Sequence, residues 1–420
     1  AGDCVESLQV VLAGGEILEI GRQPWALDDP VESLSVVNTL ARETGLLLQQ
    51  NAGLLIRPPW AEVARGSGYR FEDALDGDQV NLARLVCGSE GTLAMITEAT
   101  LRLEPIPKVR GLILLFFSRL ETAARAVLEF GKEQLAACDL MDRRLLEIAR
   151  ETESVYASIV PRGAEAMLLV ELQGDEPMPV RKRLLGLVQR LERRGKAVVS
   201  YRLTTDHKER NLMWRLARRV IPRLYKLKGN LRPLPFVEDL SIPPQRLPEF
   251  LLEIQNVLKQ ERVTATIFAH ALHGHVDVRP FLDLANPEDQ IRVSRLSDSI
   301  FEKVFEFGGC ISGEHALGMS RAGYAEKQLG PRLDLCRRVK RIFDPTGILN
   351  PGKYLSPTPP KANENLRAVP KFENRVNNSI VESEESRTEP QAKPTHSSKP
   401  RRTNHAEAED IQEIGASLPV

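Results

Sequence analysis

Residues 86–103 read Val-Cys-Gly-Ser-Glu-Gly-Thr-Leu-Ala-Met-Ile-Thr-Glu-Ala-Thr-Leu-Arg-Leu. The first part, Gly88 to Thr92, predicts a turn whose two glycines can bring bare backbone N–H groups close to an anionic ligand. Leu93–Leu103 then mixes β-branched and apolar residues with Thr, Glu and Arg, and ends before Pro105, which predicts a strand. On composition alone, the turn fits a tight hairpin equally well.

The whole string resembles the flavin-binding loop of the FAD-linked oxidases of the glycolate oxidase, D-lactate dehydrogenase and D-2-hydroxyglutarate dehydrogenase group. The resemblance extends from the N-terminus to about Tyr354. It implies that the loop backbone lies against FAD and that the following strand helps to hold the cofactor. The cofactor-binding positions implied in this way are Gly88, Ser89, Glu90, Gly91, Thr92 and Ile96.

Composition fits a globular protein of two domains. The 420 residues are 42% hydrophobic, with 57 Lys and Arg against 57 Asp and Glu. The net charge of zero gives no global field that favours nucleic acid or an anionic membrane, so we assign no nucleic-acid partner. The most apolar run, Gly111–Phe117, is too short for a transmembrane segment. The five cysteines are scattered and odd in number, which argues against a disulfide framework and makes a reduced, cytoplasmic setting the default expectation.

Strand-like and helix-like segments alternate along the chain and cluster in pairs. Ser7–Leu12 and Glu16–Ile20 predict two strands joined at Gly14-Gly15. Leu112–Phe117 predicts a fully apolar strand, and Leu140–Arg150 predicts a helix. This order predicts an α+β fold, with an antiparallel sheet that carries helices on one face.

The resemblance divides this α+β fold into domains. It implies a partial flavin-binding α+β domain over 1–108 and an antiparallel-sheet substrate domain over 109–355. Relatives carry an earlier cofactor-binding half with its own glycine-rich pyrophosphate loop, and no Gly-Gly-Gly-Thr-like string occurs in this sequence. We therefore expect the chain to lack the N-terminal half of the FAD-binding domain. Residues 356–420 contain little that could be buried, which predicts a disordered tail.

A histidine cluster suggests a metal site. Three of the seven histidines lie within residues 270–275, and at strand spacing His273, His275 and Asp277 face one side. Imidazole and carboxylate groups are ordinary ligands of zinc or manganese. A hydrogen-bonded or exposed cluster is the competing interpretation. In the metal-dependent members of the resembling family, two histidines of this segment bind a divalent metal; His270 matches the first, and Asp277 replaces the second.

Ser312-Gly313-Glu314-His315 resembles a second family motif, Ser-Gly-Glu-His-Gly-x-Gly. The resemblance implies that Glu314 is a metal ligand and that His315 lies beside the flavin as the general base. Oxidation of a 2-hydroxy acid needs the hydroxyl proton removed while hydride leaves C2, and a histidine with a pKa near neutrality suits that transfer. A helix N-terminus capped by Ser312 would have the same composition.

Three further candidate residues come from the C-terminal two-thirds of the chain. The segment from Asp344 to Lys353 resembles the end of these oxidases, where Asn350 and Lys353 would return toward the flavin. In relatives a Trp-x-x-Arg helix holds the substrate carboxylate. The matching position here is Ala217, so the neighbouring Arg218 is the substrate-binding candidate.

The resemblance therefore implies an FAD-dependent oxidoreductase that oxidises a small 2-hydroxy acid of the glycolate or D-lactate type by hydride transfer to flavin, with His315 as general base. A catalytically impaired paralogue or subunit, acting as an assembly module, is the alternative. The intact 312–315 motif and flavin loop favour the enzyme. Ala217 and the altered histidine string favour the module. The individual 2-hydroxy acid and the electron acceptor stay open.

Overall fold

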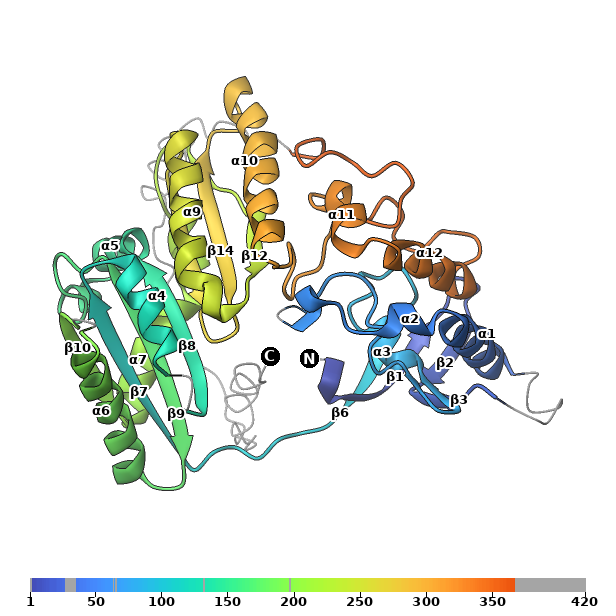
Figure 1. Ribbon diagram of the computed structural model, residues 1–420, viewed down its shortest axis with the longest axis horizontal. Coiled ribbons are helices and arrows are strands. Elements are labelled where there is room, and N and C mark those ends of the chain that lie inside the picture. The colour runs from blue at the N-terminus through green and yellow to red at the C-terminus, as the bar shows by residue number, and fades with distance from the viewer. Residues whose placement is uncertain are drawn as a thin grey trace, which may run out of the picture. The chain divides into compact units, whose positions relative to one another are not determined.

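Three antiparallel β-sheets organise the described part of the chain in this computed structural model (Figure 1). The structure describes residues 2–26, 35–62, 64, 66–130, 133–195 and 198–366, which belong to one compact unit that begins at Gly2. The tail predicted over 356–420 lies outside these residues from 367 onward. No helix among the residues described is long and apolar enough to cross a membrane.

The first sheet contains the predicted N-terminal hairpin. Strands β1 (Val5–Val11) and β2 (Ile17–Ile20) pair antiparallel, and β6 (Met95–Leu101) pairs with the other side of β1. Leu8 and Val10 of β1 are buried in the core. All seven residues of β6 are exposed. The strand that follows the candidate flavin loop is therefore present as predicted, and it forms an edge of this sheet.

Short elements surround the first sheet. A small sheet has the order β3 (Arg22–Pro24), β5 (Gln79–Asn81) and β4 (Leu75–Asp76). The helical segments of this part are η1 (Gly2–Cys4), α1 (Val36–Gln50), α2 (Ala52–Leu55), η3 (Pro59–Glu62) and α3 (Leu82–Val86). Ser35 begins α1 by accepting a hydrogen bond from the backbone N–H of Asn38, an ordinary N-cap. Helix α3 leads directly into the Gly88 turn.

The large sheet has eight strands, and every pairing in it is antiparallel. Its order is β10 (Ser200–Thr204), β7 (Val109–Phe117), β9 (Ala166–Gly174), β8 (Leu135–Asp142), β13 (Ala265–His270), β14 (His275–Leu282) and β11 (Arg232–Pro233), and β12 (Val237–Ser241) also pairs with β14. The α+β class and the antiparallel sheet are confirmed.

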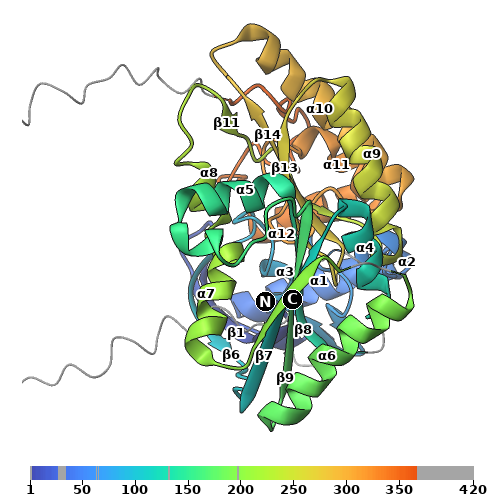
Figure 2. The ribbon, with the colours of Figure 1, turned by 90° about the vertical axis from the view of Figure 1, so that its left-hand side faces the viewer.

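Helices cover both faces of the large sheet, so the prediction of helices on one face was wrong (Figure 2). One face carries α4 (Leu120–Leu128), α6 (Pro177–Arg193), α9 (Leu247–Gln260) and α10 (Pro287–Glu306). The other carries α5 (Arg143–Thr152), η4 (Ser154–Ala157), α7 (His207–Arg218) and α8 (Val220–Leu224). Strand β7 explains the difference, because Ile113 packs into the first layer and Leu112 and Leu114 into the second.

The C-terminal segment returns to the N-terminal part of the fold. The short helix η5 (Pro244–Arg246) precedes α9. Three helical elements follow α10: η6 (Ala322–Tyr324), α11 (Ala325–Leu329) and α12 (Arg332–Phe343). Helix α12 packs against α1, although nearly 300 residues separate them in sequence (Figure 1). This return brings residues 310–350 close to the candidate flavin loop.

Candidate functional site

A buried acid, Asp239 of β12, organises the predicted catalytic motif. Its carboxylate accepts hydrogen bonds from the Ser312 hydroxyl at 2.7 Å and from the backbone N–H groups of Glu314 at 2.8 Å and His315 at 2.9 Å. Its backbone carbonyl accepts from the N–H of Gly313 at 2.7 Å. Asp239 is 4% exposed, and Arg321 lies 3.5 Å from the carboxylate. Residues 312–315 are therefore wrapped around one charge, which the sequence analysis had not identified.

The imidazole of His315 is more than half exposed and lies beside Glu238, the residue before Asp239. The distance from His315 Nδ1 to Glu238 Oε1 is 3.7 Å. Glu238 raises the pKa of His315 to about 9, with smaller contributions from the charges of Asp239 and Asp277, while burial acts in the opposite direction. The expected pKa near neutrality is therefore replaced by one at which the ring is protonated at pH 7.

The three neighbouring histidines are arranged around the turn between β13 and β14. Nδ1 of His270 lies 2.8 Å from Asp139, and Nδ1 of the buried His275 lies 3.0 Å from Glu314. Burial lowers the pKa of His270, but the hydrogen bond and charge of Asp139 give a net upward direction. The hydrogen bond from His275 lowers the pKa of Glu314. Both rings are thus paired with carboxylates within the protein.

The predicted metal site of His270, Asp277 and Glu314 is not supported. Asp277 is bound to Arg279 at 2.9 Å and accepts from the backbone N–H of Asp239 at 2.8 Å. Each of its two carboxylate oxygens is engaged in one of these contacts. Among the described residues, no group of three His, Cys, Asp or Glu side chains has an arrangement suited to a metal ion. The hydrogen-bonded cluster, which was the competing interpretation, describes these histidines better.

The candidate flavin loop lies against the predicted catalytic motif. The two carboxylate oxygens of Glu90 accept from the backbone N–H groups of Leu317 at 3.0 Å and Gly318 at 2.9 Å. The side-chain amide of Asn350 donates to the carbonyl of Glu90, and Lys340 Nζ donates to the carbonyl of Thr92 at 2.8 Å. Two motifs that are more than 200 residues apart in sequence are therefore brought together, as is the predicted Asn350.

Backbone and side chains of this loop face different ways. Ser89 and Thr92 are buried, and the Thr92 hydroxyl is bonded to the Ser89 carbonyl and to Tyr69 OH, both at 2.6 Å. Gly88 and Gly91 are exposed, with left-handed φ values of +85° and +67°. A Cβ atom at Gly88 would meet no atom within 4 Å. This exposed backbone is compatible with a flat anionic cofactor, whereas the two hydroxyls point into the protein.

Three other predicted positions have distinct surroundings. Ile96 is 48% exposed on β6, immediately after the loop. Burial raises the pKa of the Glu90 carboxyl, and the charge of Lys353 is among the smaller influences that act in the opposite direction. Arg218 is exposed on α7, with its guanidinium 5.5 Å from the ring of Trp214. The roles of Ile96 and Lys353 toward a cofactor, and of Arg218 toward a substrate, stay predictions.

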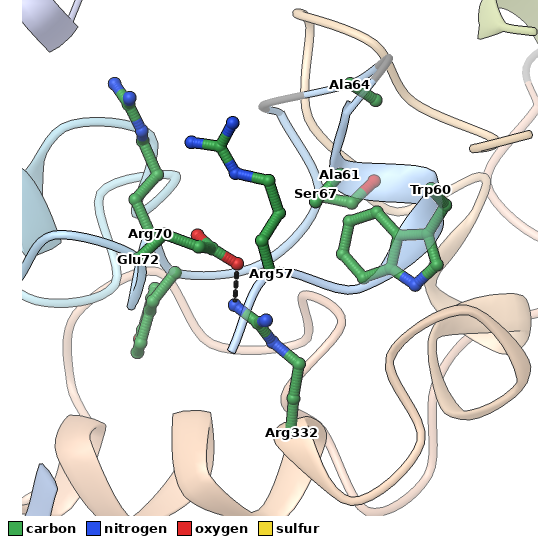
Figure 3. Close-up of a pocket in the computed structure, with 9 residues that line it drawn as sticks. Arg57, Trp60, Ala61, Ala64, Ser67, Arg70, Glu72 and Arg332 are labelled. Atoms are coloured by element: carbon green, nitrogen blue, oxygen red, sulfur yellow. Dashed lines mark ion pairs between the residues drawn. The ribbon is translucent and has the colours of Figure 1, made fainter. Parts of the chain in front are cut away.

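A small polar pocket lies in the N-terminal part of the fold (Figure 3). Arg57, Arg70 and Arg332 line it together with Glu72, which pairs with Arg332 at 2.6 Å. Ser67, also in its wall, donates to the carbonyl of Ser312 at 3.0 Å. The cavity measures about 20 Å³, room for about one water molecule, so it does not provide space for a flavin.

Comparison with known proteins assigns the family. Residues 106–354 match the family model of FAD linked oxidases, C-terminal domain. This match covers more than half of the chain, and the chain therefore belongs to the FAD-linked oxidase family.

The chain is also similar to curated proteins of this kind. It is 29% identical over 369 residues to a D-2-hydroxyglutarate dehydrogenase of Pantoea ananatis, a match that covers 84% of this chain and 36% of that protein. It is 32% identical over 286 residues to the glycolate oxidase subunit GlcD of Escherichia coli K12, covering 67% of this chain and 55% of that subunit. The chain thus spans between about a third and just over half of the length of these two relatives.

Solved structures support the fold. The p-cresol methylhydroxylase structure with substrate bound matches with a TM-score of 0.54 and 14% identity, over 84% of this chain and 65% of that one. The 4-ethylphenol oxidase of Gulosibacter chungangensis has the same TM-score and identity, over 84% of this chain and 66% of that one. At this identity the likeness concerns the fold alone.

Proposed function

We propose that this chain is part of an FAD-dependent oxidoreductase that oxidises a 2-hydroxy acid of the glycolate or D-lactate type. Membership of the FAD-linked oxidase family and the names of the relatives support this proposal. The observation that carries it is the contact between the flavin loop and the His315 segment through Glu90. In this proposal residues 1–108 contribute the flavin loop, and residues 109–355 form the substrate domain.

The proposed roles follow from the side chains present. Bound FAD would supply the hydride acceptor of the reaction. His315 would remove the hydroxyl proton of the substrate, after losing its own proton. Asp239 would fix the position of the His315 backbone, and Glu238 would hold the imidazole. The exposed Arg218 is the candidate partner of the substrate carboxylate, although its guanidinium now lies over Trp214.

A second candidate function is a non-catalytic assembly module. It is favoured by Asp277, whose carboxylate is committed to Arg279, and by Ala217 at the position where relatives carry an arginine. Such a subunit would keep the fold without turning over a 2-hydroxy acid. Turnover measurements separate the two functions directly.

The test is His315→Ala in the complete FAD-loaded oxidoreductase of which this chain is proposed to be a part. Removing a general base lowers kcat by about 10²- to 10⁴-fold. FAD content should stay unchanged, because the backbone of the flavin loop would not be altered. His207→Ala, a change at the start of α7, serves as the matched control and should leave kcat unaffected. Near-normal turnover by His315→Ala on glycolate, D-lactate and D-2-hydroxyglutarate would reject the catalytic role.

A further inference from the structure

We infer that Glu90 is a positioning residue, which fixes the flavin loop against the segment that carries His315. The inference rests on the proposed function, and it assigns to Glu90 a role other than contact with the cofactor. A residue in a cofactor loop is expected to turn its functional group toward the ligand. The Glu90 carboxylate instead faces the protein and bonds to Leu317 and Gly318.

The carboxylate makes two separate hydrogen bonds. One oxygen accepts from the N–H of Leu317 at 3.0 Å, and the other from the N–H of Gly318 at 2.9 Å. Consecutive N–H groups directed at one anion form an anion-binding concavity of the backbone. Here the anion is a side chain of the same protein. A carboxylate offers one acceptor oxygen to each N–H group, whereas a glutamine amide carries an NH₂ donor in place of one of the two oxygens.

Both sides of this contact adopt an unusual backbone conformation. Glu90 has a φ of +57°, and Ala316, which precedes the two N–H donors, has a φ of +74°. Left-handed conformations are unfavourable for residues with a Cβ atom. Two of them at one contact indicate that the surrounding interactions impose this geometry. The Glu90 carboxylate directly joins the two strained sites, because it binds the N–H groups of the two residues that follow Ala316.

The remaining contacts of the loop do not replace the bridge. Asn350 binds the carbonyl of Glu90, and Lys340 binds the carbonyl of Thr92. These bonds attach the loop to α12 and to the segment after it, and not to residues 312–318. Within the described structure, the Glu90 carboxylate provides the side-chain hydrogen bonds between the loop and residues 317–318. Because Leu317 is two residues from His315, a shift at Leu317 would displace the imidazole relative to the loop.

Burial disfavours the charged form of Glu90, and the two backbone hydrogen bonds favour it. Desolvation raises the pKa of the Glu90 carboxyl, and the N–H groups of Gly318 and Leu317 act in the opposite direction. A carboxylate kept in a partly buried position for flavin contact alone would need a ligand to compensate it. In this structure the backbone of the His315 segment already provides that compensation.

The first test uses hydrogen exchange on the 420-residue chain without added cofactor. In Glu90→Ala, the amides of Leu317 and Gly318 should exchange at least about tenfold faster, because both lose their acceptor. In Glu90→Gln, which keeps the side-chain size, one of the two amides should lose protection. The control is Glu104→Gln at an exposed position after β6, which should leave both amides unchanged. Unchanged exchange at 317 and 318 in Glu90→Gln overturns the inference, as does a uniform increase across the whole chain.

The second test uses the complete FAD-loaded oxidoreductase of which this chain is proposed to be a part. Glu90→Gln should lower kcat by about 10- to 100-fold through displacement of the base, with FAD content and KM near those of the parent. Loss of FAD with normal exchange at 317 and 318 would instead assign Glu90 to cofactor contact and overturn the inference. The exchange measurement does not depend on turnover, so it remains decisive if the His315→Ala test rejects the proposed function. If Glu90→Ala does not fold, Glu90→Gln carries both tests.

Discussion

At the scale of single residues, Glu238 contacts both Arg279, which is buried, and His315, which is exposed. Its carboxylate lies 2.9 Å from Arg279 and 3.7 Å from His315. Arg279 is buried and also bonded to Asp277, so it keeps one carboxylate when the other is removed. His315 is exposed and has Glu238 as its nearest acid. A change at Glu238 should therefore act on the imidazole more than on the folded core.

We predict that Glu238→Gln shifts the pH dependence of the reaction. Glu238 raises the pKa of His315 to about 9, and an ordinary histidine has a pKa of about 6.5. A general base works in its neutral form, which is scarce below its pKa. Removing the negative charge should therefore move the acidic limb of kcat/KM to lower pH. The shift should be smaller than the whole difference between these two pKa values, because Asp239 and Asp277 also raise the pKa of His315. Profiles measured from pH 6 to 10 check this, and a limb that stays in place in Glu238→Gln contradicts it.

The sequence reveals motifs of neighbouring residues, but it does not reveal hydrogen bonds between residues that are distant in the chain. Family resemblance singled out residues 88–92 and 312–315, but no local pattern indicated that Glu90 connects the first segment to Leu317 and Gly318. Asp239 was missed because its strand carries two adjacent acids, and the sequence does not show which of them is buried. The ion pair of Asp277 could have been predicted from the sequence. Arg279 is two residues further along a strand and therefore lies on the same face. That spacing favours an ion pair over a free metal ligand.

At the scale of elements, Lys340 near the end of α12 forms an ion pair with Asp344 and a hydrogen bond to the flavin loop. Lys340 Nζ lies 2.6 Å from Asp344 and donates to the carbonyls of Leu349 at 2.9 Å and Thr92 at 2.8 Å. Asp344 in turn accepts from the backbone N–H of Leu349 at 2.7 Å. Burial would raise the pKa of Asp344, but Lys340, the Leu349 N–H and Thr346 lower it to about 2.

We predict that Asp344 stabilises the fold at neutral pH and that acid removes this contribution. A pKa lowered from 3.8 to about 2 corresponds to roughly 2 kcal/mol, present above pH 4 and lost as the pH falls through 2. Asp344→Asn should therefore lower the urea midpoint at pH 7, and the difference from the parent should shrink by pH 2.5. Asp334→Asn, at an exposed position in the first turn of α12, is the control. An equal effect of Asp344→Asn at both pH values would contradict the prediction.

Elements with a strong pattern were predicted well, and elements whose ends depend on tertiary contacts were not. The apolar run in β7 correctly predicted a strand. Because its residues are apolar at consecutive positions, the same run also indicates burial on both faces of the sheet. Leu140–Arg150 was predicted as one helix. The structure ends β8 at Asp142 and begins α5 at Arg143, with Asp142 capping the helix through the N–H of Leu145 at 3.0 Å. Pairing of β8 with β9 and β13 decides that boundary.

At the scale of the whole molecule, the candidate site is assembled by long-range contacts. The flavin loop comes from the N-terminal part of the chain, the base from residues 312–315, and Asn350 from the segment after α12. Amphipathic patterns locate helices and strands, but they carry little information about which distant segments meet. Family resemblance supplied this information for the loop and the base. The contacts of Asp239 with residues 312–315 became visible only in three dimensions.

The open side of the flavin loop leads to the last prediction. Gly88 and Gly91 are exposed, and β6 presents Met95 at 62% and Ile96 at 48% exposure to solvent. Small-ligand sites in proteins usually bury roughly 70–90% of the ligand surface. A flavin lying on this loop and strand would be covered on one side only by the residues described.

We therefore predict that the 420-residue chain, purified alone, binds FAD weakly or not at all. Titration followed by flavin fluorescence should show no tight saturable phase, and gel filtration should remove the flavin absorption. Riboflavin, which lacks the pyrophosphate and the adenosine, should behave in the same way, because one exposed wall gives little selectivity between the two. A stoichiometric flavin band that survives gel filtration would contradict the prediction. In that case something must cover the exposed face of β6, and sedimentation would show whether a second copy of the chain does so.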